Sequence, residues 1–184
     1  EGLIFEKIEL VDEIPRKIKH HYIGMDFGYE HDPTAIVRVG IQDDCLYVEE
    51  LCYKTQMLTG EIIKELKAKC PDEKIISESA DPRLVQEIYR AGLNIHPVQK
   101  YGGSVDAGLQ KMKEFRICIT KGSLNVIKEF KNYVYDKDKE GNFLNTPIDA
   151  FNHAIDAIRY VILMQVLGAN RRKISLDRIR DAVY

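Results

Sequence analysis

The chain has 184 residues, of which 45% are hydrophobic, and its 27 basic and 29 acidic residues leave a formal net charge of -2. This length and composition predict one domain with a hydrophobic core. The near balance of charge excludes a nucleic-acid partner held by overall charge, so such a partner has to bind local basic patches. Four scattered cysteines without a C-x-x-C pair argue against a zinc site or a disulfide scaffold and fit a reducing cytoplasm. No apolar run approaches the roughly 20 residues of a membrane span, so we expect a soluble intracellular protein without a membrane partner.

The two ends of the chain differ from the segment between them. Residues 1–21 mix charged and apolar side chains without a clear period and contain Pro15, so we expect a connecting arm. Residues 22–168 form the predicted domain, and residues 169–184 form a basic tail that includes Arg171-Arg172-Lys173. Because the chain starts at Glu1 and not at Met, we expect it to be part of a longer polypeptide.

The predicted elements follow a recognisable order. Runs over residues 22–28, 34–41 and 45–53, joined by short turns, predict an antiparallel meander of three strands. Helices and strands then alternate. Helices are expected over 58–69, 82–90, 104–115, 124–132 and about 148–167, strands over 74–78, 94–98 and 116–120, and a hairpin over 133–145. This order predicts an α/β fold of the ribonuclease H-like type, a mixed five-stranded sheet flanked by helices, whose first strand lies next to the fourth.

Acidic residues end the first and the fourth predicted strands. The apolar residues at positions 23, 25 and 27 share one strand face, so Asp26 shares the opposite face with Gly24 and needs a polar or cationic partner there. Glu78 lies at the carboxyl end of the fourth strand, where ligands gather in open sheets. Asp81 precedes Pro82 and is placed to cap the next helix. We therefore assign chemistry to Glu78 and capping to Asp81.

The final predicted helix adds a third group of polar residues. Asp149, His153 and Asp156 are spaced four and three residues apart, which places them on one stripe of a helix. Such a helix, packed on the sheet, would aim His153 and Asp156 at Asp26. Asp149 is assigned to the start of the helix, with Thr146 as the N-cap, because acids complement the dipole there.

The combination of these groups indicates metal chemistry. Carboxylates that converge in one cleft repel one another unless a cation intervenes. Hard oxygen ligands with one imidazole suit Mg²⁺ or Mn²⁺. Two such ions about 3.5–4 Å apart would activate water and stabilise the leaving oxygen in phosphodiester hydrolysis. The pattern predicts a metal-dependent nuclease with Asp26, Glu78, His153 and Asp156 as its catalytic and metal-binding residues.

Three other interpretations use the same residues. Another ribonuclease H-like nuclease, such as a resolvase or integrase, would share the acids but not the His-x-x-Asp helix together with the hairpin. One half of an actin-like ATPase would use residues 26–28 as a phosphate loop, but that fold needs two such halves. A non-catalytic interaction domain would pair its acids with Arg38, Arg83 or Arg159.

Four segments resemble the C-terminal nuclease domain of tailed-phage terminase large subunits. They are GMDFGY (24–29) with DPTA (32–35), SESAD (77–81), KYGGSV (100–105) with GLQ (108–110), and PIDAFNHAIDAIRY (147–160). The resemblance runs from about residue 22 to residue 167, and its specificity lies in the ordered set. It implies a nuclease that cuts concatemeric viral DNA, with metals held by Asp26, Glu78, His153 and Asp156. Some relatives carry Asp at the position of Glu78.

The resemblance also implies partners. The chain has no G-x-x-x-x-G-K-[ST] phosphate loop, so the packaging ATPase would be a separate N-terminal domain of the same polypeptide, joined through residues 1–21. Double-stranded DNA, the terminase small subunit and the portal protein are implied as partners, in the cytoplasm of the bacterial host.

Lysines near the Gly-rich loop and on the hairpin are the predicted DNA contacts. The helix N-terminus after the loop can receive a phosphate. Taken singly, each of these lysines also fits a solvated surface charge. The candidates are Lys100, Lys111, Lys113, Lys131, Lys137 and Lys139.

Overall fold

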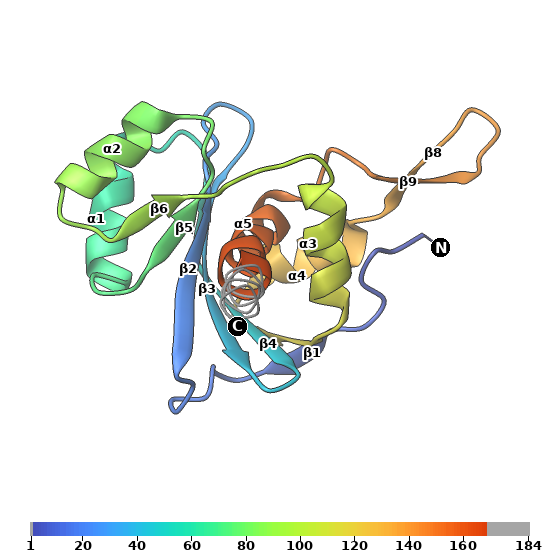
Figure 1. Ribbon diagram of the computed structural model, residues 1–184, viewed down its shortest axis with the longest axis horizontal. Helices are drawn as coiled ribbons and strands as arrows, with labels where there is room; N and C mark the ends of the chain where they lie inside the picture. The colour runs from blue at the N-terminus through green and yellow to red at the C-terminus, as the bar shows by residue number, and fades with distance from the viewer. Residues whose placement is uncertain (1, 169–184) are drawn as a thin grey trace, which may run out of the picture.

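The computed structural model describes residues 2–168, in which seven strands form one mixed sheet and two more form a hairpin (Figure 1). The strands of the large sheet are β1 (Glu9–Val11), β2 (His20–Asp26), β3 (Thr34–Gln42), β4 (Cys45–Lys54), β5 (Ile75–Ser77), β6 (Ile95–Pro97) and β7 (Arg116–Thr120). The hairpin strands are β8 (Tyr135–Lys137) and β9 (Phe143–Pro147). The helices are α1 (Thr59–Lys69), α2 (Pro82–Arg90), α3 (Ser104–Lys113), α4 (Leu124–Asn132) and α5 (His153–Val161), and α5 continues as the π-helical stretch η1 (Ile162–Leu167).

The strand order of the large sheet is β1-β7-β4-β3-β2-β5-β6. β2, β3 and β4 form the predicted antiparallel meander, and β5 lies parallel to β2 with β6 parallel to β5. The predicted fold class and the predicted pairing of the first and fourth strands of the domain are therefore confirmed. The sheet has seven strands where a five-stranded sheet was predicted. The strand expected over 116–120 joins it as β7, parallel to β4, and β1, which the sequence placed in the arm, adds an unpredicted edge strand parallel to β7.

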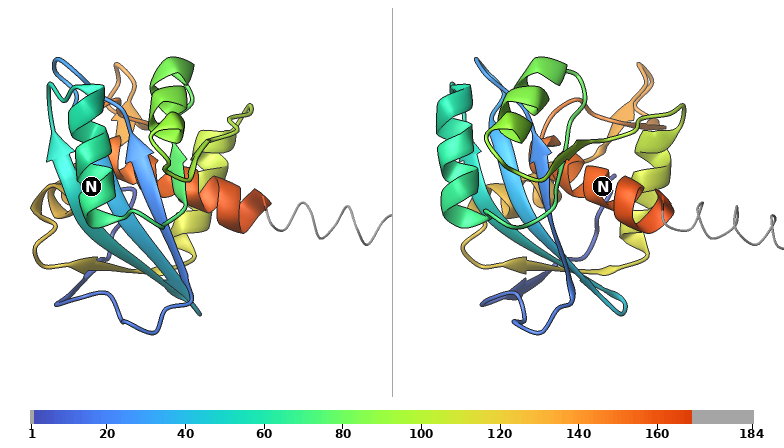
Figure 2. Two further views of the ribbon diagram at one scale, coloured as in Figure 1. Left: turned by 90° about the vertical axis from the view of Figure 1, so that its left-hand side faces the viewer. Right: turned by 60° about the vertical axis from the view of Figure 1, so that its left-hand side comes forward.

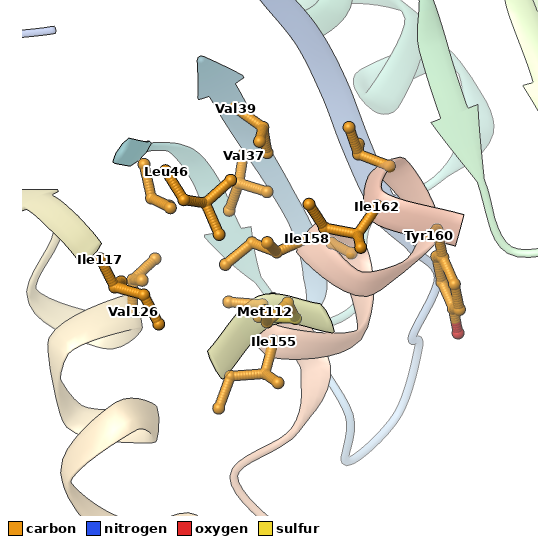
Figure 3. Packing of buried hydrophobic residues seen from close by; sticks show 14 of the residues in the cluster. Val37, Val39, Leu46, Met112, Ile117, Val126, Ile155, Ile158, Tyr160 and Ile162 are labelled. Atoms are coloured by element: carbon orange, nitrogen blue, oxygen red, sulfur yellow. The ribbon is translucent and has the colours of Figure 1, made fainter. Parts of the chain in front are cut away.

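Helices cover both faces of the sheet (Figures 1 and 2). On one face, α1 and α2 pack in a cluster that joins Ile62 to Met25 of β2. On the other face lie α3, α4 and α5, and Ile158 of α5 packs in the cluster that contains Val37 of β3 (Figure 3). The alternation of β2 has its predicted result: Met25 faces α1 and α2, whereas Asp26 faces α5.

The N-terminal segment packs against the domain. β1 pairs with β7, and the Ile4 amide donates to the Tyr133 carbonyl at 3.0 Å. Ile4 and Phe5 are buried, and the rings of Phe5 and Phe130 lie 4.9 Å apart. The segment predicted as an arm thus covers one edge of the core. Its link to an ATPase domain stays a prediction, and the predicted basic tail, residues 169–184, lies outside the described residues.

The predicted hairpin is confirmed and projects from the body of the domain (Figure 1). Asp138 organises its tip, since its Oδ1 accepts the amides of Glu140 at 3.0 Å and Asn142 at 2.8 Å. Gly141 has a φ of +88°, a conformation that glycine adopts without strain. The sequence cue of Asp, Gly and Asn in the middle of the segment therefore identified the turn correctly.

The last helix begins later than predicted. α5 starts at His153 with Asn152 as its N-cap, whereas Thr146 lies in β9 and Asp149 lies in the loop between them. Asp149 is exposed, and its Oδ1 accepts from Asn152 Nδ2 at 3.3 Å. The predicted cap by Thr146 and the assignment of Asp149 to the helix start were therefore wrong.

The backbone before α5 explains the late start. The Ile148 amide donates to the Val134 carbonyl at 3.1 Å, so the chain still follows the hairpin at this point. Phe151 then adopts a φ of +55°, outside the right-handed helical region. None of the helices that the structure describes has the length and apolar character needed to cross a membrane.

Candidate active site

Close contact between β2 and α5 places the candidate site. A Cβ atom at Gly24 would lie only 2.2 Å from the Ala157 carbonyl oxygen, so this approach requires glycine. α5 therefore rests directly on the strand. Asp26, two residues after Gly24 on the same strand face, meets the side chains that α5 presents.

Asp26 is the centre of these contacts and is 8% exposed. Its Oδ1 accepts a hydrogen bond from the Tyr160 hydroxyl at 3.0 Å, and its Oδ2 lies 3.2 Å from His153 Nδ1. Burial raises the pKa of Asp26, the bond to His153 opposes that rise, and the negative charges of Glu78 and Asp156 add to it. Three predicted site residues thus act on the same carboxyl group, one by contact and two by their charge.

Tyr160 was absent from the predicted site, although its position carried a signal. It lies seven residues after His153 and four after Asp156, so the three residues share one helix stripe. The tyrosine is 2% exposed, and its hydroxyl donates to Asp26. Burial is the main cause that raises the pKa of Tyr160, and the neighbouring Asp26 charge adds to it. Tyr160 thus remains a donor that holds the carboxylate.

Glu78 lies directly after β5. Its amide donates to the Met25 carbonyl at 2.9 Å, which fixes the end of β5 beside the end of β2. Its carboxylate is partly exposed and lies 3.4 Å from Lys100 Nζ. Lys100 also lies over the Tyr160 ring, 5.3 Å from its centroid. Lys100, which the sequence placed among the DNA contacts, therefore borders the acidic site.

Asp156 is held by Arg159. Arg159 Nε donates to Asp156 Oδ1 at 3.0 Å, and Arg159 Nη2 lies 3.0 Å from Oδ2, a two-point contact. Arg159 is 3% exposed, and its Nη1 has no hydrogen-bond partner among the described residues. Gly108 of α3 makes room for this side chain, because a Cβ there would lie 2.4 Å from Arg159 Cγ. The arginine that the sequence named as a possible partner of a site acid does pair with Asp156.

Asp32 joins the site from the turn between β2 and β3. Its Oδ1 lies 3.5 Å from His153 Nε2, so both ring nitrogens of the histidine face a carboxylate. The hydrogen bond with Asp26 is the main cause that raises the pKa of His153, burial opposes it, and the Asp32 charge adds a smaller rise. The turn is held by Thr34, whose hydroxyl donates to the Gly28 carbonyl at 3.0 Å. The sequence offered no sign of this role beyond the nearness of Asp32 to Asp26.

The predicted ligands, Asp26, Glu78, His153 and Asp156, have the atom types that bind a divalent cation, but their side chains are not arranged around a common point. Among residues 2–168, no group of three or more His, Cys, Asp or Glu side chains is arranged to hold a metal ion. Oxygen donors with one imidazole are the set that Mg²⁺ and Mn²⁺ accept. The charges of Glu78 and Asp156 raise the pKa of Asp26, and a cation among them would relieve this repulsion.

Asp81, the other acid near the end of β5, has the predicted structural role. Its Oδ1 accepts the amides of Arg83 at 3.1 Å and Leu84 at 3.2 Å, at the first turn of α2. Pro82 occupies the first helical position. The predicted capping role of Asp81 is therefore confirmed, whereas the chemical role assigned to Glu78 stays a prediction.

Two grooves adjoin the site. One has a volume of about 630 Å³ and is lined by Phe27, Asp32, Glu78 and Arg83, among others. The second has a volume of about 740 Å³, and its walls include Asp32, His153, Lys54 and Lys128. Asp32 lines both grooves, and each groove also contains one of the predicted ligands, Glu78 in the first and His153 in the second.

The predicted DNA-binding lysines do not form one cluster with the acids. Lys111 and Lys113 lie on α3, where Lys111 pairs with Glu114 and Lys113 donates to the Tyr135 hydroxyl at 2.8 Å. Lys137 lies 4.4 Å from the centroid of the Phe143 ring on the hairpin. Lys131 and Lys139 are exposed. Of the six, Lys100 is the one in contact with a site carboxylate.

The strand order and the aspartate at the end of the central strand define the class as ribonuclease H-like. The family described as "Terminase RNAseH like domain" matches residues 26–163, and the chain belongs to this family. The resemblance to phage terminase large subunits is therefore confirmed.

Two curated relatives give the wider comparison. The chain is 29% identical over 143 residues to the PBSX phage terminase large subunit of Bacillus subtilis (strain 168), a match that covers 76% of this chain and 33% of the relative. It is 32% identical over 146 residues to the terminase large subunit of Bacillus phage SPP1, covering 74% of this chain and 34% of the relative. The chain thus spans about one third of the length of these relatives.

Solved structures agree. The large terminase nuclease domain of bacteriophage SPP1 with bound Mn matches with a TM-score of 0.79 and 27% identity, covering 88% of this chain and 98% of that one. The P22 large terminase nuclease domain has the same fold, with a TM-score of 0.71 and 18% identity over 89% of this chain and 92% of that one.

Proposed function

We propose that the chain is the nuclease domain of a phage terminase large subunit and cuts concatemeric double-stranded viral DNA by metal-dependent phosphodiester hydrolysis. The observation that carries this proposal is the contact of Asp26 with His153 and Tyr160 at the end of the central strand. Membership of the terminase family and likeness to the Mn-bound SPP1 nuclease domain support it.

The proposed cofactor is Mg²⁺ or Mn²⁺, bound as two ions. Asp26, Glu78, His153 and Asp156 would hold them, and the bound cations would supply an activated water and neutralise the leaving oxygen. Lys100 and Arg159 neutralise two of these carboxylates in the described structure. The carboxylates would therefore have to be shared between these basic groups and the cations.

The contribution of the chain itself is the placement of the ligands. The Tyr160 hydroxyl fixes one oxygen of Asp26, which leaves the other facing His153. His153 is in turn oriented by carboxylates at both ring nitrogens. This arrangement limits rotation of the imidazole and of the Asp26 carboxyl group. Less conformational entropy is therefore lost when these groups are ordered in the transition state.

Double-stranded DNA is the proposed substrate. The grooves beside Asp32 offer a path past the acids. Basic side chains would hold the phosphates on either side through charge, with the strong salt dependence that such contacts give. The proposed contacts are Lys100, Lys111, Lys113, Lys131, Lys137 and Lys139.

The remaining partners follow from the longer relatives. Since the chain spans about one third of those polypeptides, we propose that a packaging ATPase domain precedes it in the same protein. The terminase small subunit and the portal protein are the further proposed partners, and the cytoplasm of the bacterial host is the proposed location.

A plasmid-nicking assay tests the proposal. Supercoiled plasmid is incubated with the protein and Mn²⁺ or Mg²⁺, with and without chelator, and an Asp26→Asn variant is compared with Asp12→Asn. Asp12 is an exposed acid that pairs with Lys121 far from the site, so its variant should nick like the wild type. Nicking that survives either chelator or Asp26→Asn would refute the assignment.

One observation favours a second candidate function. The pairing of Asp156 with Arg159 and of Glu78 with Lys100 is also what a non-catalytic interaction domain would show. The same assay separates the two functions, because such a domain would leave plasmid intact under every metal condition.

A further inference from the structure

The helix that carries His153 and Asp156 lacks a cap of its own. The first amides of a helix have no acceptor within the helix, and a polar side chain just before it commonly supplies one. Asn152 holds the N-cap position of α5, but its side chain makes no capping hydrogen bond. The amides of the first turn of α5 therefore depend on another part of the chain.

Glu129 of α4 supplies the missing acceptor. Its Oε2 accepts from the Ile155 amide at 3.0 Å. Burial raises the pKa of Glu129, and the nearby Ala154 and Ile155 amides oppose that rise because they favour the charged carboxylate. Its Oε1 accepts from the Tyr53 hydroxyl of β4 at 2.7 Å. Glu129 is 1% exposed, so a buried carboxylate from another helix faces the positive end of α5.

A second helix of the same domain has the same device. The Glu50 carboxylate of β4 accepts the amides of Asn125 at 2.9 Å and Val126 at 3.1 Å, and the N-cap residue Ser123 makes no side-chain cap. Both carboxylates reach a helix N-terminus from a separate element. They differ in the helix that they hold, because Glu129 holds the start of α5, which begins with His153, whereas Glu50 holds the first turn of α4, one turn before Glu129 itself.

We propose that Glu129, oriented by Tyr53, is a positioning residue that fixes the first turn of α5 and thereby sets His153 against Asp26. The expected effect on DNA cleavage rests on the proposed nuclease function. The role of Glu129 in fixing the first turn of α5 does not depend on that function. Glu129 makes no hydrogen bond to the site acids, although it lines the groove beside Asp32 and its charge helps to raise the pKa of His153. Its hydrogen bond to α5 is to the backbone amide of Ile155, so it positions the helix through its backbone. A shift of about 1 Å in such a group is enough to reduce catalysis strongly.

The test compares Glu129→Gln with Glu50→Gln. Glutamine keeps the shape of the side chain but offers one acceptor oxygen in place of two and no charge. We expect Glu129→Gln to raise the hydrogen exchange of the Ala154 and Ile155 amides about tenfold, as loss of a cap does, and to shift the His153 imidazole resonances in metal-free protein. Glu50→Gln should leave both signals as in the wild type.

Kinetics extend the comparison. If the domain cleaves DNA as proposed, Glu129→Gln should lower kcat about tenfold with little change in KM, because alignment and not DNA binding is lost. Glu50→Gln at the same temperature should retain kcat. Equal losses in the two variants would mean that Glu129 contributes only to general stability, and the inference would be wrong.

The two possible failures are distinguishable. A wild type that does not cleave DNA would refute the proposed function, while hydrogen exchange at the Ile155 amide would still decide the role of Glu129, because the Glu129 charge acts on the His153 imidazole directly. Unchanged exchange at Ala154 and Ile155 in a folded Glu129→Gln protein would overturn the inference. If Glu129→Gln does not fold, Tyr53→Phe removes only the hydroxyl that orients the carboxylate. Tyr53→Phe should change the amide hydrogen exchange and the His153 resonances in the same direction by a smaller amount. A folded Tyr53→Phe protein with wild-type exchange and resonances would overturn the inference.

Discussion

Replacement of Gly24 by alanine tests whether the contact between β2 and α5 sets the site. The new Cβ would lie 2.2 Å from the Ala157 carbonyl oxygen, whereas ordinary contacts begin at 3.4 Å. Because the obstacle is backbone, no side-chain rotation can relieve it, and α5 has to retreat by about 1 Å. That retreat carries His153 and Asp156 away from Asp26.

Two losses of different size should follow. Overpacking of this kind costs about 1–3 kcal/mol of unfolding free energy, which for a domain of this length lowers Tm by about 2–12 °C. A displacement of about 1 Å in the catalytic groups can reduce the rate by about 10²-fold. The proposed nicking activity should therefore fall far more than the folded fraction does.

Gly60→Ala is the matched control. A Cβ at Gly60 meets nothing within 4 Å, and the residue lies in α1, on the face of the sheet opposite α5. Alanine there should leave nicking unchanged and raise stability by up to about 1 kcal/mol. The assay is plasmid nicking at a temperature where circular dichroism shows both variants folded. Wild-type stability and activity of Gly24→Ala would refute the account of how α5 is placed.

Three further changes give predictions of different kinds. Arg159→Met should lower the unfolding free energy of metal-free protein by about 3 kcal/mol, because Asp156 loses its buried partner, and saturating Mn²⁺ should restore part of that loss in urea titrations. Burial raises the pKa of Cys70 from 9.0 to about 12, so the unfolded thiol ionises first as pH rises. Unfolding free energy should fall through this window in the wild type more steeply than in Cys70→Ala. Replacing Lys137 and Lys139 together by Gln should weaken DNA binding, measured by fluorescence anisotropy, and reduce the salt slope by about 2.

Each of these predictions has a contrary result. An Arg159→Met loss that Mn²⁺ leaves unchanged would show that no cation neutralises Asp156. Parallel pH curves for wild type and Cys70→Ala would contradict the effect of burial on that thiol. A salt slope identical to that of the wild type would remove the hairpin lysines from the DNA path.

The parts of the fold that rest on local patterns were predictable. The alternation in β2 placed Asp26 opposite Met25, and the three-residue spacing of His153 and Asp156 put both on one helix stripe. Asp81 before Pro82 gave the cap of α2. In these cases the deciding residues lie within a few positions of one another, so one sequence window contains the relevant physics.

The features that were missed depend on residues far apart in the chain. β1 finds its partner in β7, where Glu9 lies opposite Cys118, and a short run of charged and apolar residues gives no sign of that pairing. The start of α5 is delayed because Ile148 is still bonded to Val134 across the hairpin. The cap of the same helix comes from Glu129, 26 residues before Ile155. A local helix rule has no access to any of these partners.

The measurement that tests the central claim most directly is anomalous diffraction from crystals of this domain soaked in Mn²⁺. The account predicts manganese peaks among Asp26, Glu78, His153 and Asp156. It also predicts that Glu78 and Asp156 bind the metal and no longer pair with Lys100 and Arg159 alone. Crystals at saturating Mn²⁺ that show no peak there, with the Arg159–Asp156 and Lys100–Glu78 pairs intact, would contradict it.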